Sequence, residues 1–140
     1  MADDLAHRVV AKMLERDRFS EWLGIKVVHH TAGSAQVEML VRDEMLNGFD
    51  VAHGAIPFAL ADSAVAFAAN GYGKVSMSIE NSMSYPASVR SGQRLMAKAV
   101  ELHSSNRLGI YDVRVTTEDG TLVGLFRGTV YRTEKSFFPE

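Results

Sequence analysis

The spacing of hydrophobic residues changes several times along the chain, and each change predicts a different element. Residues 3–18 carry apolar side chains at intervals of three to five positions, which is typical of an amphipathic helix. Residues 25–31 and 34–41 have a strand-like composition, and apolar and polar side chains alternate along the second run. Trp22 and Leu23 connect the helix to these strands, and we expect both side chains to pack inward.

The run from Gly54 to Asn70 has a different pattern, since Ala, Leu and Phe dominate it and Asp62 is its one charged residue. This composition favours a helix, and a helix that is apolar on all sides is a buried one. Asn70 and Gly71 are suited to end the helix. The pattern therefore predicts a central buried helix with one carboxylate in its middle, and an unpaired carboxylate is too costly to bury for packing alone.

Alternation with a period of two returns after Gly73 and predicts four more strands joined by short turns. An Asp-Gly pair at 119–120 is a strong hairpin signal between the last two strands. In the earliest of the four strands, which covers residues 75–84, strict alternation puts Ser78 on one face and Asn81 on the other. The expected strands cover residues 75–84, 93–103, 108–117 and 121–132, and residues 133–140 are expected to form a loose tail.

The predicted elements follow the order helix, two strands, buried helix and four strands, without an internal repeat or a linker. Short connections between consecutive strands favour antiparallel pairing. The order therefore predicts one α+β domain over residues 1–140, in which an antiparallel sheet wraps around the central helix.

Composition and charge exclude several classes of function. Fifteen basic and seventeen acidic residues give a net charge of −2, and their dispersal along the chain indicates no nucleic-acid partner. The absence of cysteine excludes disulfides, cysteine zinc sites and thiol nucleophiles. The start, MADDLAHR, lacks the apolar core of a signal peptide, and the central run is too short for a membrane span. We therefore expect a soluble, cytoplasmic protein without a membrane partner.

His53-Gly54 lies at the predicted start of the central helix, where backbone N–H groups are free and the helix dipole is positive. Such a position can hold a carbonyl oxygen that gains negative charge, and Gly54 leaves room for a substrate to approach the backbone. The alternative is structural, with Gly54 at a bend and His53 packed in the core. Taken alone, the two residues favour the structural alternative, because short glycine motifs often arise by chance.

Asp62 also has a catalytic and a structural interpretation. As a catalytic group it can act as a general base or as a nucleophile. As a structural group it can be exposed on an amphipathic helix or paired in a salt bridge. Its apolar neighbours, including Ala61, Ala64 and Phe67, argue against exposure and favour the catalytic interpretation.

The spacing of Gly54 and Asp62 has a consequence if both residues are functional. Eight helical residues separate them by about 12 Å along the helix axis. One reaction centre needs both groups at about 3 Å. The two groups can then act on one carbonyl only if they come from different subunits, so the spacing predicts an oligomer with a shared site.

Other polar residues are weaker candidates. Asn47 can hydrogen-bond a substrate carbonyl or orient His53, and as a turn former it can equally have no chemical role. The serines between positions 76 and 84 can line a cavity or face solvent, and one of them can position water. His29 and His30 point to opposite faces of a strand and make a poor metal pair. No metal-site, serine-hydrolase or nucleotide motif occurs, so a metal-dependent or nucleoside-triphosphate enzyme is not expected.

In combination, these residues resemble those of hotdog-fold acyl-CoA thioesterases of the phenylacetic-acid-degradation type. The resemblance rests on Asn47, on His53-Gly54 six positions later, and on Asp62 within FALADSAVAFAAN. The later SMSYPASVRSGQRL and GTLVGLFRGTVYR fit the strands of that family, and the resemblance covers residues 20–132. The family usually has His-Gly-Gly at this position, whereas this chain has His53-Gly54-Ala55, with alanine in place of the second glycine. Alanine suits a first helical turn, so we expect activity to survive.

The resemblance implies a six-stranded antiparallel sheet around the central helix and subunits paired into dimers and often tetramers. It implies that the Gly54 N–H polarises a thioester carbonyl with support from Asn47 and His53. Asp62 of the neighbouring subunit would activate water or attack directly. Ser78 falls where a related branch of the family places a water-positioning serine.

The resemblance also indicates which residues contact the two ends of the substrate. Arg90, Asn106 and Arg107 fall where such proteins often contact the nucleotide of coenzyme A. Phe58 is expected to help line an acyl or aryl pocket, together with Met45, Phe49 and Tyr85. This lining is compatible with an aromatic or a medium-chain acyl group and does not choose between them.

The leading hypothesis is hydrolysis of an aryl- or medium-chain acyl-CoA, such as a phenylacetyl- or hydroxyphenylacetyl-CoA, to the free acid and coenzyme A. No cofactor or metal is expected, because a thioester is already activated. The alternative is an acyl-CoA-binding protein without catalysis, which tight binding without turnover would favour. A hydratase or dehydratase is less favoured, because that chemistry usually needs a histidine on the helix and His53 precedes it.

Overall fold

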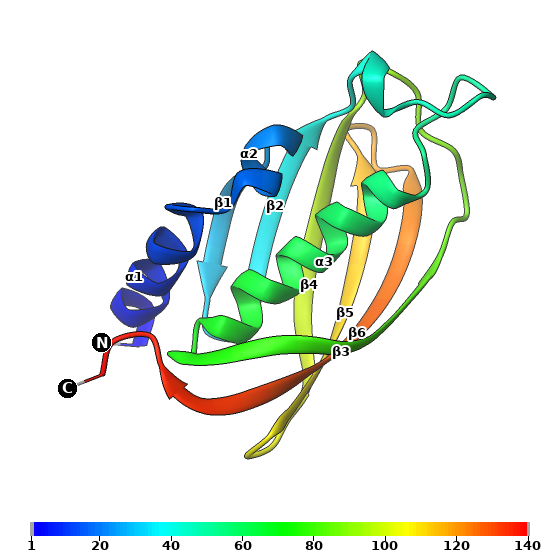
Figure 1. Cartoon of the computed structure of the whole chain (residues 1–140). Coiled ribbons are helices and arrows are strands. Elements are labelled where there is room, and N and C mark those ends of the chain that lie inside the picture. The colour runs from blue at the N-terminus through cyan, green and yellow to red at the C-terminus, as the bar shows by residue number, and fades with distance from the viewer. Residues whose placement is uncertain (1, 140) are drawn as a thin grey trace.

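A long helix, α3 (Ala55–Asn70), lies across the concave face of a curved sheet in the computed structural model, which describes residues 2–139 (Figure 1). α3 packs against every strand, and side chains such as Leu60, Ala64 and Phe67 are fully buried between the helix and the sheet. The core therefore forms around the Ala-rich run, as its composition predicts. Among residues 2–139, no helix is long and apolar enough to cross a membrane.

The sheet has six strands in the order β1-β2-β4-β5-β6-β3, and every neighbouring pair is antiparallel. This arrangement confirms the predicted α+β architecture and places β1 and β3 at the two edges. The strands are β1 (Lys26–Thr31), β2 (Ser34–Leu40), β3 (Lys74–Ser84), β4 (Arg94–Ser104), β5 (Leu108–Thr117) and β6 (Leu122–Ser136).

The N-terminal region differs from the prediction of one helix over residues 3–18. It contains α1 (Ala2–Leu14) and a separate short helix, α2 (Arg18–Leu23). Asp17 divides them, because its carboxylate accepts hydrogen bonds from the backbone and hydroxyl of Ser20 and caps α2. Leu23 is buried as expected, but the inward packing of Trp22 was wrong, since its side chain is 49% exposed.

The predicted tail was partly wrong, because β6 continues to Ser136. Its polar last residues pair with the start of β3, where Lys74 is opposite Ser136. The pattern of apolar positions ends before this pairing does, so alternation could not reveal it. A one-turn helix, η1 (Asp43–Met45), also precedes the loop that leads to α3.

A β-bulge changes the predicted faces of β3. Ser78 pairs with Val130 and Glu80 pairs with Thr129, so Ile79 is an extra residue with no partner on β6. The extra residue reverses the alternation beyond it. Ser78 and Asn81 therefore lie on the same face, and the strict alternation predicted from the sequence was wrong here.

Candidate active site

The first turn of α3 leaves one backbone N–H group free. The Ala55 N–H donates to Nδ1 of His53 at 3.1 Å, and the Ile56 N–H donates to the His53 carbonyl at 2.8 Å. Within residues 2–139, no acceptor is hydrogen-bonded to the Gly54 N–H. The start of α3 can therefore offer this N–H to a carbonyl oxygen.

His53 supports this turn rather than packing in the core, because its side chain is exposed. Since Nδ1 accepts the Ala55 N–H, the neutral imidazole carries its proton on Nε2. Gly54 has φ −54° and ψ −26°, which any residue can adopt. The use of glycine here therefore lies in the close approach that it permits and not in its backbone angles.

Tyr85 contacts the same turn from the end of β3. Its hydroxyl donates to the Gly54 carbonyl at 2.9 Å, and its ring lies 3.5 Å from the position of a side chain at residue 54. Burial raises the pKa of Tyr85, which keeps the hydroxyl protonated as a donor. The sequence suggested Tyr85 only as a pocket-lining residue, because nothing local indicates a contact across 31 positions.

A small pocket of about 310 Å³ lies beside Gly54. Gly54 and Tyr85 form part of its wall, and the loop after Tyr85 supplies much of the rest. Residues lining this pocket include Ala52, Gly54, Pro57, Tyr85, Ala87 and Val89. The free N–H is thus next to space that a small part of a ligand can enter.

Asp62 lies in the middle of α3 and is held by two residues of β3. Oδ1 of Asp62 accepts from the Ser78 hydroxyl and from Nδ2 of Asn81, both at 3.3 Å. Burial raises the pKa of Asp62, while the two hydrogen bonds lower it. No salt bridge joins Asp62 to another residue in the part of the chain that the structure describes, so the salt-bridged alternative is wrong.

The structure keeps Gly54 and Asp62 apart within one chain, since Gly54 immediately precedes α3 and Asp62 is eight residues further along it. The Ser78 hydroxyl is hydrogen-bonded to Asp62, and His53 is hydrogen-bonded to the turn that contains Gly54. The predicted catalytic residues therefore form two groups, one at the start of α3 and one at its middle.

Asn47 belongs to neither group in this structure. Its Oδ1 accepts the Phe49 N–H at 2.9 Å, and its backbone N–H donates to the Val51 carbonyl at 2.8 Å. No hydrogen bond links its side chain to His53 within residues 2–139. The amide oxygen of Asn47 thus has the turn-forming role that the sequence left open.

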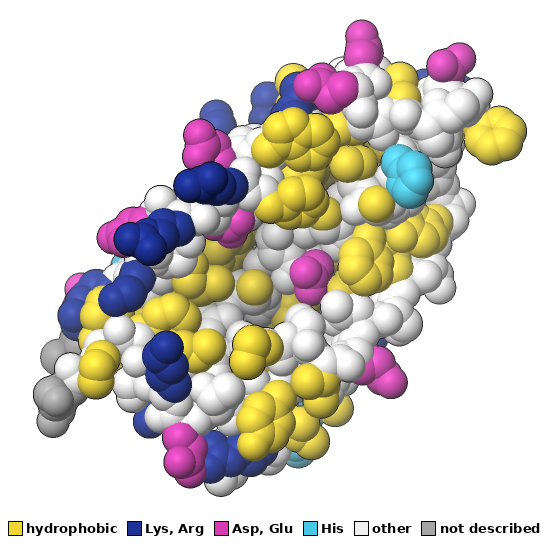
Figure 2. All heavy atoms as spheres, in the orientation of Figure 1, with side chains coloured by type: hydrophobic (Ala, Val, Ile, Leu, Met, Phe, Trp, Pro, Cys, Tyr) yellow, Lys and Arg dark blue, Asp and Glu magenta, His cyan; other side chains and the backbone are white. Residues whose placement is uncertain are grey.

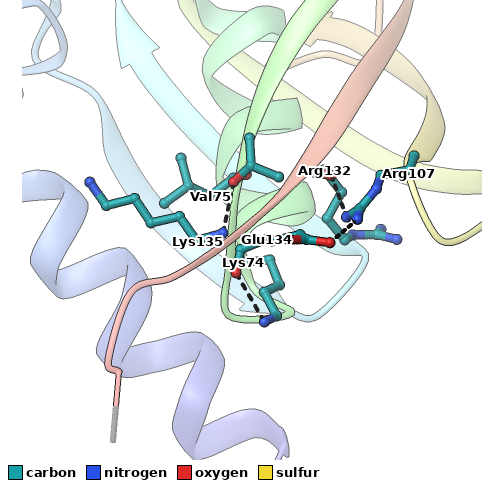
Figure 3. Close-up of polar contacts among 7 residues, drawn as sticks. Lys74, Val75, Arg107, Arg132, Glu134 and Lys135 are labelled. Atoms are coloured by element: carbon teal, nitrogen blue, oxygen red, sulfur yellow. Dashed lines mark hydrogen bonds and ion pairs between the residues drawn. The ribbon is translucent and has the colours of Figure 1, made fainter.

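Asn106 and Arg107 line a basic pocket of about 570 Å³ at the far end of the sheet. Lys74 and Arg132 lie beside them, and Glu134 reaches between these cations (Figure 3). Arg107 pairs with the Glu134 carboxylate at 2.5 Å and donates to the Arg132 carbonyl at 3.3 Å. Lys74 and Arg132 were missed because both are distant from Asn106 and Arg107 in the sequence, and only the pairing of β6 with β3 and β5 brings them together.

Arg90 does not join this pocket. It precedes β4, whereas Asn106 and Arg107 follow it, so the eleven residues of β4 place them about 35 Å apart. The structure therefore brings Asn106 and Arg107 together and leaves Arg90 of the same chain apart from them, so the expected nucleotide contact of Arg90 stays a prediction.

Phe58 is half-buried on α3, and its ring meets Phe126 of β6 edge-on, with centroids 5.2 Å apart. Met45 is buried, whereas Phe49 is 87% exposed in the loop before α3. Figure 2 shows that the α3 face of the molecule is hollowed and bordered by hydrophobic side chains. An acyl-binding surface on this face would involve Phe58, while Phe49 does not line the pocket beside Gly54.

The model of the thioesterase superfamily matches residues 49–124 of this chain. The chain belongs to the thioesterase superfamily. The match begins at Phe49, just after Asn47, and includes Gly54, Asp62 and Ser78, so both groups of candidate residues lie within the region of family likeness.

Three relatives of this thioesterase-superfamily chain extend the likeness over most of its length. A putative esterase of Archaeoglobus fulgidus is 37% identical and covers 96% of this chain and 88% of the relative. The acyl-coenzyme A thioesterase PaaI of Escherichia coli is 33% identical over 86% of each chain. The solved structure of the E. coli PaaI protein, from the phenylacetic acid degradation operon, superimposes on this chain with a TM-score of 0.94. The match covers 97% of this chain and 99% of that one, at 30% identity.

The third relative is the Streptococcus mutans protein smu.793, whose structure is bound to acetyl CoA. It is 25% identical, with a TM-score of 0.77 over 80% of this chain and 90% of that one. Together with the E. coli protein, these matches confirm the predicted hotdog-fold thioesterase of the phenylacetic-acid-degradation type and the prediction of a thioester hydrolase.

Proposed function

We propose that this protein hydrolyses an aryl- or medium-chain acyl-CoA to a free acid and coenzyme A, without a cofactor. The proposal rests on one observation: a helix that offers a free N–H at its start and carries a hydrogen-bonded carboxylate at its middle. The first group suits a developing oxyanion, and the second suits activation of water.

The Gly54 N–H holds the carbonyl oxygen of the thioester. Water bonds to the carbonyl carbon as Asp62 takes a proton from it, and the carbonyl oxygen becomes an oxyanion. The C–S bond then breaks, and the coenzyme A thiolate leaves and takes up the proton that Asp62 removed from water. In the nucleophilic route, an oxygen of Asp62 bonds to the carbonyl carbon first, the C–S bond breaks, and the coenzyme A thiolate leaves. Water then hydrolyses the resulting anhydride, which releases the acid and restores the Asp62 carboxylate, and the thiolate takes up the proton that the water gives up. Both routes end in the same acid and thiol.

The shared site of this proposal needs a second subunit, because Gly54 and Asp62 are about 12 Å apart along α3. The exposed edge strand β3 supports such an assembly. One side of β3 pairs with β6 and the other is open, while Met77 and Ile79 on it are 58% and 60% exposed. A long, partly apolar open edge favours pairing with another strand. A second copy on β3 would bring two α3 helices close to one another.

The basic pocket supports binding of the phosphates of coenzyme A. Lys74, Arg107 and Arg132 supply three cations, and guanidinium groups suit bidentate contact with phosphate. Glu134 holds Arg107 when no phosphate is bound, so binding exchanges one anion for another (Figure 3). Any contact from Arg90 would come from another subunit, because it lies at the opposite end of β4.

The acyl class is supported by Phe58 and Phe126, whose edge-on pair lies at the first turn of α3. An aromatic acyl group gains further edge-on contacts from such a pair, and a medium chain gains apolar burial. The E. coli relative is named an acyl-coenzyme A thioesterase, which supports the thioester and leaves both acyl classes open.

The test is thiol release from phenylacetyl-, hydroxyphenylacetyl-, octanoyl- and acetyl-CoA by the native protein and by Asp62→Asn. Asp112→Asn is the control, because it removes a carboxylate on the outer face of β5 that pairs with Arg127. We expect release by the native and control proteins, with aryl or octanoyl substrates preferred, and little release by Asp62→Asn. Binding of every substrate without release would contradict hydrolysis and favour the acyl-CoA-binding alternative.

A further inference from the structure

Asn81 is a half-buried polar contact of Asp62 that the alternation of β3 did not predict. The bulge at Ile79 turns Asn81 to the face of Ser78, and both side chains then donate to the same oxygen, Oδ1 of Asp62. Neither hydrogen bond reaches Oδ2. One carboxylate oxygen is thus held, and the other is left for a reacting water or carbonyl.

The other end of the Asn81 amide has no hydrogen-bond partner. Its Oδ1 is buried and unpaired within the described chain. It lies over Gly128 of β6, where an added Cβ would be only 2.8 Å away. A buried amide oxygen without a partner costs free energy, so packing alone gives no reason for asparagine at this position.

The orientation of the amide follows from the charge on Asp62. An ionised carboxylate accepts hydrogen bonds only, so the NH₂ group of Asn81 must face it and the carbonyl must face Gly128. The reversed amide would direct its oxygen at the carboxylate. A donor to the ionised form favours that form, so the contact selects for the base and not for the neutral acid.

We propose that Asn81 is a positioning residue for Asp62, and that the Ile79 bulge and Gly128 exist in this site to let it reach the carboxylate. This proposal rests on the proposed thioesterase function. Asn81 and Ser78 hold Oδ1, favour the ionised form of Asp62 and leave Oδ2 for the reaction centre. Gly128 leaves the space that the amide oxygen occupies.

The test combines a direct titration with kinetics. The Asp62 carboxyl is followed by ¹³C NMR across a pH series in the native protein, with Asp62→Asn to assign the signal. Asn81→Ala removes the donor, and Asn81→Asp keeps the shape but adds a like charge. Ser82→Ala is the control, because this exposed neighbour on β3 has no hydrogen bond to Asp62.

We expect the Asp62 titration to move to higher pH in Asn81→Ala and further in Asn81→Asp, and not to move in Ser82→Ala. The acid limb of the kcat profile should move in parallel, and kcat of Asn81→Ala should fall roughly 10- to 100-fold with little change in KM. Gly128→Ala, which displaces the amide from beneath, should reproduce the change of Asn81→Ala.

An unchanged Asp62 titration in Asn81→Ala would overturn the proposal, whatever the activity. A native protein without thioesterase activity would instead contradict the proposed function, and the NMR titration would still measure the contact. Should Asn81→Ala fail to fold, the nearly isosteric Asn81→Asp decides the question by the same titration.

Discussion

The start of α3 and its middle are built in different ways. At the start, the candidate functional group is a backbone N–H, and contacts among residues 53–56 leave it free. At the middle, the candidate functional group is the Asp62 side chain, and its partners Ser78 and Asn81 come 16 and 19 positions later on another element. The first region depends on local backbone geometry and the second on the register of a strand.

This difference determines what a substitution can change. A backbone N–H survives most side-chain replacements, so the start of α3 is sensitive to loss of the N–H itself or to a shift of the turn. The carboxylate at the middle is lost by one replacement, and its ionisation responds to each neighbour. The two regions should therefore fail in different ways when they are altered.

Asp62→Asn tests the middle most directly. Loss of the base or nucleophile should reduce kcat roughly 10²- to 10⁴-fold, since general acid–base catalysis contributes about this much. The protein should unfold at the same or a higher temperature at neutral pH. Burial raises the pKa of Asp62, so its ionisation destabilises the fold in full above the folded-state pKa. This penalty shrinks as pH falls through the folded-state pKa and is absent below the unfolded-state pKa.

The measurement is kcat together with thermal unfolding at several pH values, for the native protein and Asp62→Asn. The stability advantage of Asp62→Asn should be largest at neutral pH and should shrink as the pH is lowered. A variant that is both inactive and much less stable at neutral pH would indicate a structural carboxylate instead.

Gly54→Pro and Gly54→Ala distinguish the effect of losing the N–H at the start of α3 from the effect of adding a side chain there. Proline suits the φ of −54° but has no N–H, whereas alanine keeps it and meets Tyr85 at an ordinary 3.5 Å. Gly54→Pro should lose roughly 10²- to 10³-fold in kcat, which is typical for one oxyanion donor. Gly54→Ala should lose much less. Equal kcat values for the two variants, both folded by circular dichroism, would contradict the role of the N–H.

The same contrast explains how far the sequence could predict this protein. The start of α3 follows from local features, because a glycine before an apolar helix indicates free N–H groups without knowledge of the fold. The strands followed from alternation to within a few residues. Asp62 was identified because a single carboxylate in an apolar helix needs a reason.

The middle of the site could not be completed from the sequence, because one extra residue at Ile79 changes which side chains share a face. The effect of a bulge appears only when the partner strand is known. The contact of Tyr85 with Gly54 and the pairing of β6 with Lys74 depend on folding in the same way. Local periodicity has no access to these distant pairs.

Arg107→Ala tests whether the nucleotide end of the substrate binds in the basic pocket, outside both regions of α3. The loss of a guanidinium–phosphate contact should raise KM for acyl-CoA roughly 10-fold and leave kcat nearly unchanged. A thioester of N-acetylcysteamine lacks the phosphates, so its KM should not change. Arg114→Ala, which removes an exposed arginine of β5 outside the pocket, is the control. A matching rise in KM for both thioesters would place the effect elsewhere than on the nucleotide.

Tyr85→Phe gives the smallest expected effect and the finest test of the comparison. The substitution removes the hydroxyl that donates to the Gly54 carbonyl and keeps the ring beside it. A neutral hydrogen bond is worth about 1 kcal/mol, so kcat should fall roughly fivefold as the turn loosens. The Asp62 titration should not move, because the Tyr85 hydroxyl donates at the start of α3 and not to Asp62. If Tyr85→Phe shifts the titration of Asp62, the two regions are coupled through the helix and do not act as independent parts.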